Sequence, residues 1–281
     1  MKFSAVELDK QAIGYGNSYK NQLSLIRLLI IKWVFAFIMI LSPQLVLAEY
    51  SCPLLFQRGE VYSESSIRFT IFNVQKTENV RWKQELFDKL VEQSDITLIQ
   101  EAVDVMSYSS VKHKISFYDS WKSENFETGL ATLSRVQPML SMKLVSPTAE
   151  PISNTPKVSS IEQYSVAGQA ESLLVVNTHG INFRPLVDFK MQIDEIFAAI
   201  KNHKGPMLWA GDFNTWSPGR KKYLMQIAKK LSLTEVVFEN RKEFLLILDH
   251  AFIRGMNIRS AQQLDVEISD HRPLELVLDF I

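Results

Sequence analysis

Cysteine is almost absent from this chain of 281 residues, and glycine and proline number only ten each. The single cysteine, Cys52, excludes an intramolecular disulfide framework. Internal repeats and low-complexity tracts are also missing from the sequence. Because 46% of the residues are hydrophobic, the chain has enough apolar side chains for one large domain or two small ones.

An excess of one charge sign is a further absence, since 31 basic side chains balance 31 acidic ones. Residues 1–48 hold five basic and two acidic side chains, so residues 49–281 carry 26 and 29. This balance excludes a broadly basic body that grips nucleic acid by charge alone. Binding of a polyanion would depend on local patches or on a metal ion.

A long apolar segment is present between Leu23 and Ala48. Basic residues before it and a polar stretch after it are typical of a secretory signal peptide. The segment is also long enough for an uncleaved membrane anchor, because about 20 apolar residues cross a bilayer. A buried helix is the third alternative. We expect residues 49–281 to be exported, as a periplasmic or secreted protein, with or without membrane contact through residues 23–48.

The remaining sequence predicts a linker over residues 49–66 and one catalytic domain over residues 67–281. Strands are expected at 67–74, 95–101, 128–135, 139–145, 172–178, 206–212, 235–238, 246–253, 258–266 and 274–280. Helices are expected at 80–93, 186–200 and 220–231, and the Pro- and Ser-rich stretch Pro147–Ser160 predicts a loop. Strands alternate with helices, yet several strand pairs follow one another directly. This mixture favours an α/β fold of two packed mixed β-sheets flanked by helices.

The segment Gly211-Asp212-Phe213-Asn214 ends one of the apolar strands. Positions i and i+2 of a strand project from the same face, so Asp212 and Asn214 can point into one pocket. Gly211 allows a close approach of another backbone or of a ligand. A carboxylate beside a carboxamide suits work on phosphate and water; capping of the following helix is the alternative role.

Polar side chains recur where other apolar strands end or are interrupted. They are Asn73, Glu101, His179, Asp249 with His250, and Asp270 with His271. If these ends converge, the cluster supplies hard oxygen ligands for Mg²⁺, a base and hydrogen-bond donors for phosphate. The pattern therefore favours metal-assisted hydrolysis of phosphoesters.

The chain resembles the endonuclease/exonuclease/phosphatase superfamily over about residues 67–280. The resemblance is carried by Phe72–Val74, Ile99–Glu101, Gly129–Arg135, Asn177–His179, Gly211–Asn214, Leu248–His250 and Ser269–His271. His179–Phe183 and Asp212–Ser217 are most similar to an uncharacterised bacterial branch. The resemblance implies a deoxyribonuclease I-like four-layer α/β/β/α sandwich.

The same resemblance implies site roles. It implies Asn73, Glu101 and Asp270 as residues at a Mg²⁺ or Mn²⁺ ion, with Glu101 as the principal ligand. The implied catalytic residues are His179, Asp212, Asn214, Asp249 and His271. Asp249 would orient His271 against the phosphate, and either Asp212 or His271 would remove the proton of the attacking water.

For the substrate, the resemblance favours a phosphodiester, with nucleic acid first and a phospholipid or small phosphodiester as the alternative. We expect a monomer. A protein of another class, an inactive envelope binding protein that kept the fold, is the remaining alternative.

Other polar and aromatic residues receive weaker expectations. Arg220-Lys221-Lys222, at the start of a predicted helix, could hold a phosphate backbone but is expected to form a solvated face. His250 is expected to point away from Asp249, because neighbours in a strand face opposite ways. Phe183 and Trp216 are candidates for lining the substrate mouth or for packing.

Overall fold

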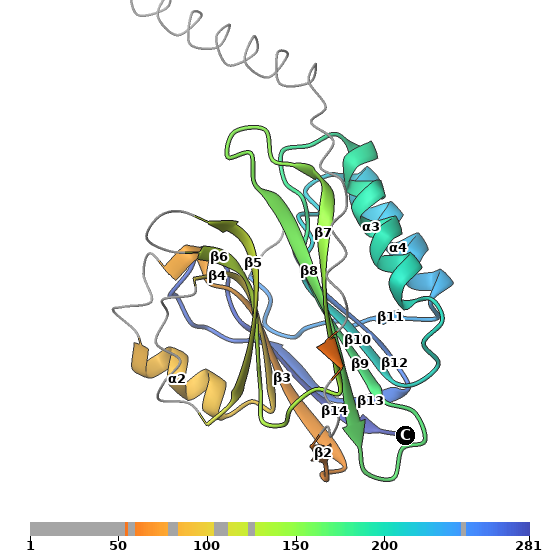
Figure 1. Cartoon of the computed structure of the whole chain (residues 1–281). Coiled ribbons are helices and arrows are strands. Elements are labelled where there is room, and N and C mark those ends of the chain that lie inside the picture. Colours follow the sequence, from red (N-terminus) through yellow and green to blue (C-terminus); the bar gives the residue numbers. More distant parts are fainter. Residues whose placement is uncertain (1–53, 56–59, 78–83, 104–111, 123–126, 243–245) are drawn as a thin grey trace, which may run out of the picture. The chain divides into compact units, whose positions relative to one another are not determined.

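The computed structural model describes residues 54–55, 60–77, 84–103, 112–122, 127–242 and 246–281 (Figure 1). They belong to one compact unit, Leu45–Ile281. The predicted signal or anchor segment, residues 1–48, lies outside the described residues, as do the first residues of the helix expected at 80–93. Within the described part, no helix is both long and apolar enough to cross a membrane.

The bounds of the described elements follow in chain order. The strands are β1 (Leu54–Leu55), β2 (Val61–Tyr62), β3 (Ser66–Asn73), β4 (Ile96–Val103), β5 (Lys114–Lys122), β6 (Glu127–Ser134), β7 (Leu140–Ala149), β8 (Pro156–Val166), β9 (Leu173–His179), β10 (Met207–Asp212), β11 (Thr234–Glu235), β12 (Asp249–Arg254), β13 (Met256–Gln263) and β14 (Leu274–Phe280). The helices are the 3₁₀ helix η1 (Gln75–Thr77) and the α-helices α2 (Gln84–Glu92), α3 (Leu186–Ile200) and α4 (Pro218–Lys230).

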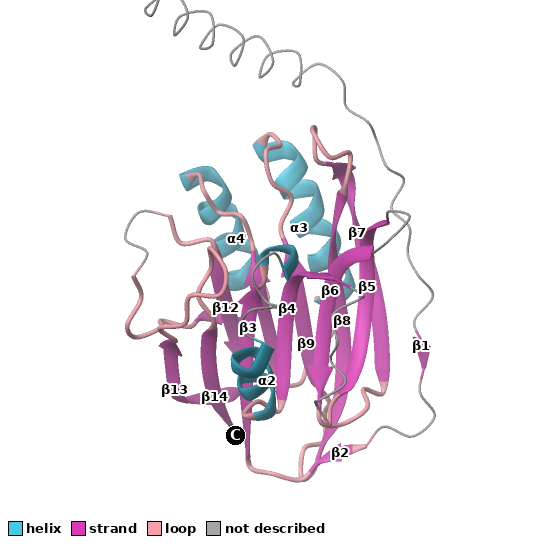
Figure 2. Cartoon of the chain, turned by 90° about the vertical axis from the view of Figure 1, so that its left-hand side faces the viewer, coloured by secondary structure: helices cyan, strands magenta, loops and turns pink. Residues whose placement is uncertain are grey.

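The described strands form two mixed sheets packed face to face. One has the order β1-β7-β8-β9-β10-β12-β11, with β2 paired to β8, and the other has the order β13-β14-β3-β4-β6-β5. Helices α3 and α4 cover the outer face of the first sheet, and α2 covers the outer face of the second (Figures 1 and 2). The predicted four-layer α/β/β/α fold is confirmed.

Buried clusters of apolar side chains hold these layers together. Between the sheets, Phe69 and Leu98 pack with Leu208 and other side chains that are all removed from water. Phe189 of α3 joins the core between the first sheet and its helices, and Phe87 of α2 joins the core outside the second sheet. Full burial of each such side chain stabilises the fold by roughly 1.5–3 kcal/mol.

Hydrogen bonds of a buried polar side chain also join the two sheets, near the end of β9. Asn177 of β9 donates its amide to the carbonyls of Ile99 and Ala131, both 3.3 Å away in the second sheet. Its oxygen accepts a hydrogen bond of 2.6 Å from the side chain of Gln100. Since all of these groups are buried, the contact fixes how β9 sits against β4 and β6.

Two sequence predictions of local structure were wrong. Most of the loop expected at Pro147–Ser160 belongs to β7 and β8, which pair in antiparallel fashion and leave only Glu150–Thr155 as the tip of a hairpin. A register shift between Val145 and Ala149 accommodates Pro147. Within the predicted linker 49–66, β1 pairs with the outer edge of β7. The strand β2 pairs with Ser165 and Val166 at the end of β8, just past the residues of β8 that pair with β7 and β9.

Candidate active site

Three neighbouring strands place three of the predicted residues in one row. Asp212, the last residue of β10, pairs in register with His179 of the parallel strand β9. On its other side, Asp212 pairs with Asp249 of the antiparallel strand β12. The sheet therefore brings together an imidazole and two carboxylates that lie far apart in the sequence.

Asp212 and Asn214 are linked as a unit at the end of β10. The backbone N–H of Asn214 donates to Oδ1 of Asp212 at 2.9 Å, and the Asn214 amide donates to the carbonyl of Gly180 at 3.0 Å. Asn214 has a φ of 51°, in the left-handed region that non-glycine residues rarely adopt. These contacts fix the orientation of both side chains. Asn214 is therefore not positioned by capping the following helix. Ser217 is the N-cap of α4.

The second sheet contributes Asn73 at the end of β3. Its amide donates to Oδ2 of Asp212 at 3.0 Å across the gap between the sheets. The carbonyl of Asn73 accepts a hydrogen bond of 2.7 Å from Ser269, which lies just before Asp270 and His271. The two sheets and the segment before β14 therefore meet at one point.

Glu101 reaches the same point through an irregularity in β4. The pairing of β4 with β6 shifts register between Gln100 and Ala102, and Glu101 in the bulge has a φ of 55°. Such a bulge redirects a side chain, and left-handed residues of this kind concentrate at functional sites. The Glu101 carboxylate lies 3.8 Å from Nε2 of His179.

His271 and Asp249 form the predicted pair, with Nδ1 2.8 Å from Oδ2 of the carboxylate. Burial by itself would lower the pKa of His271, but the charge and hydrogen bond of Asp249, helped by Asp212 and Asp270, raise it to about 10. The imidazole is therefore protonated at neutral pH. Its Nε2 lies 3.9 Å from Asp212.

Asp212 and His179 are both buried, and their pKa values shift in opposite directions. Burial, together with the nearby charge of Asp249, raises the pKa of Asp212 to about 6. Burial and the cations Lys157, His271 and Lys76 lower the pKa of His179 well below its usual value. At neutral pH the site thus holds an ionised acid, a neutral imidazole and an imidazolium side by side.

The ligand atoms of Asp212, Asp249 and His271 lie within 4.8 Å of one another, so the described residues include a group that could hold a metal ion. However, the protonated His271 offers no lone pair. Glu101 fits a hard divalent cation better, because it lines an open cavity and accepts no hydrogen bond from another described side chain. Asp270 is exposed and accepts a hydrogen bond of 3.1 Å from Ser269.

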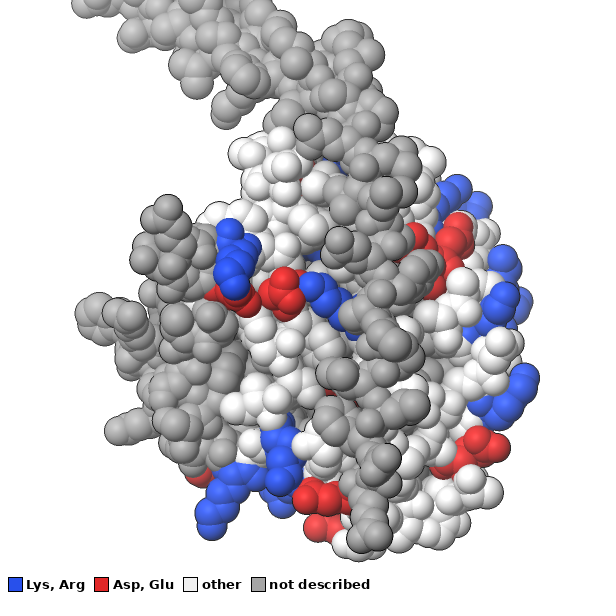
Figure 3. Space-filling model, in the orientation of Figure 1, with Lys and Arg blue, Asp and Glu red and all other residues white. Residues whose placement is uncertain are grey.

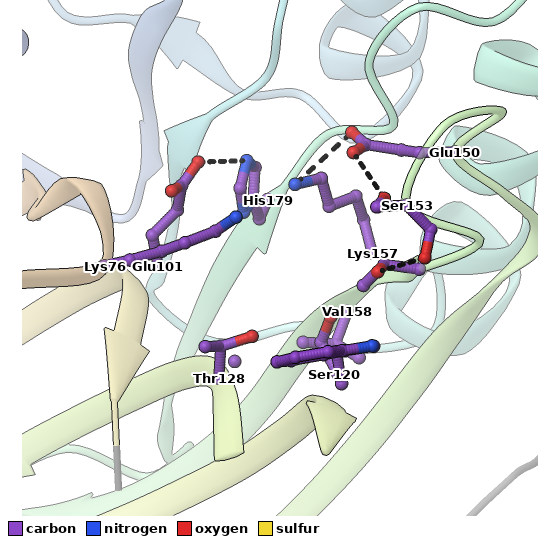
Figure 4. Close-up of a pocket in the computed structure, with 12 residues that line it drawn as sticks. Lys76, Glu101, Ser120, Thr128, Glu150, Ser153, Lys157, Val158 and His179 are labelled. Carbon is purple, nitrogen blue, oxygen red and sulfur yellow. Dashed lines mark hydrogen bonds and ion pairs between the residues drawn. The ribbon is translucent and has the colours of Figure 1, made fainter. Parts of the chain in front are cut away.

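A cavity of about 290 Å³ opens beside Glu101 and His179 (Figure 4). Its other walls include Trp121 of β5 and the hairpin between β7 and β8. Lys157 of this hairpin points toward His179 and forms an ion pair of 3.3 Å with Glu150 (Figure 4). The cavity adjoins the site on the side of the second sheet.

Apart from Glu101 and His179, sequence reasoning missed the charged and aromatic residues that line this cavity. Trp121 stands on a strand that was not expected, and Glu150 and Lys157 fall in the stretch predicted as a loop. Lys76 follows Asn73 in η1 and also has a left-handed φ of 52°. The sequence gives little signal for the hairpin, because the apolar residues Val158, Ile161 and Tyr164 recur every third position rather than every second.

Two other expectations concern groups near the site. His250 is buried on the opposite face of β12 from Asp249, as predicted, with Nδ1 2.8 Å from Glu235 and Nε2 2.7 Å from Thr215. The expectation of a solvated face was wrong for Arg220, which is fully buried, but Lys222 is exposed. Phe183 and Trp216 are partly exposed, at 70% and 42%.

Two packed sheets that carry a cluster of acids, amides and histidines at one edge define the deoxyribonuclease I-like class of α/β sandwich. A model of the Endonuclease/Exonuclease/phosphatase family matches residues 71–271. The chain belongs to this family, whose members are hydrolases that act on phosphoesters.

Relatives and solved structures agree with this assignment. A UPF0294 protein of Vibrio campbellii is 30% identical over 223 residues, which cover 75% of this chain and 77% of that protein. The endonuclease/exonuclease/phosphatase of Beutenbergia cavernae superposes with a TM-score of 0.61 at 15% identity, covering 77% of this chain and 72% of that one. The human Nocturnin catalytic domain with bound sulfate gives a TM-score of 0.57 at 18% identity, covering 83% and 98%. The predicted resemblance to the family and to a bacterial branch of it is confirmed.

Proposed function

We propose that this protein is a metal-dependent phosphodiesterase that hydrolyses its substrate by in-line attack of water. The observation that carries the proposal is the convergence of Asp212, Asn214 and the Asp249–His271 pair on the space beside Glu101. Such a set combines acid–base groups with donors for a phosphoryl group.

The roles follow from charge and position. Asp212, ionised above a pH of about 6, and the Asn214 amide orient the attacking water. The His271 imidazolium donates to a phosphoryl oxygen and stabilises its negative charge in the transition state. A divalent cation held by Glu101 and Asn73, with Asp270 nearby, would offset further charge on the phosphoryl oxygens.

Nucleic acid is the substrate class that we favour. Trp121 in the wall of the cavity is a residue of the type on which bases stack, and Lys76 places an ammonium group beside the site. Among the described residues, no carboxylate forms an ion pair with Lys76. Acidic and basic side chains are interspersed on the face shown in Figure 3, which supports recognition of a short segment rather than of a long duplex.

The test is an assay of the purified chain with Mg²⁺ and with chelator, on single-stranded DNA, RNA, sphingomyelin and bis(p-nitrophenyl) phosphate. We expect chelator-sensitive turnover, with nucleic acid preferred over lipid. The variant Glu101→Ala should lose activity about 100-fold or more, since a bound metal ion contributes several kcal/mol to transition-state stabilisation. The exposed-surface variant Lys222→Met should retain activity.

Each alternative has its own outcome. Preferential cleavage of lipid would refute the preference for nucleic acid but not the proposed phosphodiesterase activity. A folded protein without metal-dependent turnover on any of these substrates would refute the catalytic proposal and favour the inactive binding protein.

A further inference from the structure

Arg220, near the start of α4, is the most completely buried charged side chain among the described residues, with 0% of its surface exposed. Its guanidinium lies over two aromatic rings, 4.8 Å from the ring centre of Phe189 and 4.5 Å from that of Trp216. No carboxylate among the described residues accepts a hydrogen bond from it. Burial of a cation costs free energy, and hydrogen bonds from its donors offset that cost.

The two terminal nitrogens of Arg220 donate to backbone carbonyls of two loops, while its Nε has no hydrogen-bond partner among the described residues. Nη1 donates to the carbonyl of Ile181 at 2.6 Å and to that of Asn214 at 3.1 Å. Nη2 donates to the carbonyl of Arg184 at 2.8 Å. One loop follows His179 and the other contains Asn214, so both loops that leave β9 and β10 are tied to the same planar group.

Both loops contain strained backbone at the points that Arg220 holds. Asn214 has a φ of 51°, and Phe183, between the two bonded carbonyls of its loop, has a φ of 50°. A bulky residue such as Phe183 rarely adopts this region, and a residue held there strains the folded backbone. Surrounding contacts must therefore hold these loops in place. The carbonyl of Gly180 accepts the Asn214 amide, which links the loops on the side of the site.

We propose that Arg220 is a positioning residue that holds the His179 loop and the Asn214 loop in the one arrangement in which both side chains face the phosphoryl group. Arg220 makes no contact with the substrate itself. Its planar fork binds three carbonyls at once, which a lysine ammonium on a flexible stem does not reproduce. This inference rests on the proposed hydrolase function, because it assigns the loops a role in that reaction.

The test compares Arg220→Met, Arg220→Lys and Arg220→Ala with Lys222→Met, which removes a charge from an exposed position of the same helix. The readouts are kcat and KM on bis(p-nitrophenyl) phosphate with Mg²⁺, and the backbone amide shifts of Gly180 and Asn214 by NMR. We expect Arg220→Met to lower kcat about 100-fold with little change in KM, as for misplaced reacting groups. Arg220→Lys should lie between this variant and the wild type, and Lys222→Met should match the wild type. Methylguanidinium should restore part of the kcat of Arg220→Ala.

Full kcat in Arg220→Met, or equal losses in Arg220→Met and Lys222→Met, would overturn the inference. A loss that appears in KM alone would also overturn it. If the wild type has no activity, the proposed function fails, and the amide shifts decide the inference separately. Changes at both Gly180 and Asn214 in Arg220→Lys support it, and unchanged shifts refute it. If Arg220→Met does not fold, Arg220→Lys and the methylguanidinium experiment decide.

Discussion

Replacing Asp249 with asparagine should lower the pKa of His271 and move the alkaline limb of the pH–rate profile to lower pH. In the wild type, Asp249, with smaller contributions from Asp212 and Asp270, raises the pKa of His271 to about 10, although burial opposes its charge. Nδ1 lies 2.8 Å from the Asp249 oxygen, and the two side chains are only 14% and 15% exposed, so solvent screens the pair little. A close opposite charge of this kind is worth about 1–3 pH units, or roughly 1.4–4 kcal/mol.

The assay is kcat/KM against pH for the wild type and Asp249→Asn, with the His271 ring titrated by NMR in both. We expect the alkaline limb and the ring titration to fall together by about 1–3 pH units. Asp270→Asn, which removes a weaker contribution from an exposed carboxylate, should move both by less. If both titrations stay at their wild-type pH in Asp249→Asn, Asp249 does not maintain the imidazolium, and the assignment of the pair is refuted.

Three further predictions concern Asp212, Gly211 and Glu162. Because burial and Asp249 raise the pKa of Asp212 to about 6, kcat/KM should rise with pH through about 6 as the carboxylate ionises, and a flat profile between pH 5 and 8 would contradict this. Gly211→Ala should lower the free energy of unfolding by roughly 2–4 kcal/mol in a urea titration, since its φ is 137° and a Cβ would lie 2.0 Å from the Thr178 carbonyl; an unchanged midpoint would refute it. Burial raises the pKa of the Glu162 carboxyl, so the folded state favours the protonated form. Protonated Glu162 therefore stabilises the fold at a pH below the pKa of the unfolded chain, and this stabilisation is lost as the pH rises through the folded-state pKa. The melting temperature of Glu162→Gln minus that of the wild type should therefore be larger at pH 8 than at pH 4.5. An equal difference at both pH values would contradict the raised pKa of Glu162.

Local patterning predicted the layers of this fold well. Strands with continuous apolar runs, such as β9 and β10, and the amphipathic α3 were recognisable because their periodicity reports burial directly. The hairpin of β7 and β8 was not recognisable, because Pro147 and several serines are typical of loops. There the pairing of two long strands outweighed local propensity, which is weak in sheets.

The site was predictable in its residue types but not in its geometry. Strand-end positions indicated Asp212 and His179, since such ends meet at one edge of a sheet. The alternation of β4 does not reveal that Glu101 sits in a bulge, because one extra residue changes which face a side chain occupies. Nor does sequence show that Arg220 is buried, because the carbonyls it binds belong to distant loops and carry no sequence signature.

Asn177 joins the two sheets at the base of the site, and the site itself draws Asp212 from one sheet and Asn73 from the other. A chain in which a single sheet has formed therefore holds only part of the reacting groups, and not in register. Recovery of turnover during refolding should lag behind recovery of β-structure, and Asn177→Ala should lengthen that lag. In this protein, recovery of enzymatic activity would then report the last step of folding, in which the two sheets pack together.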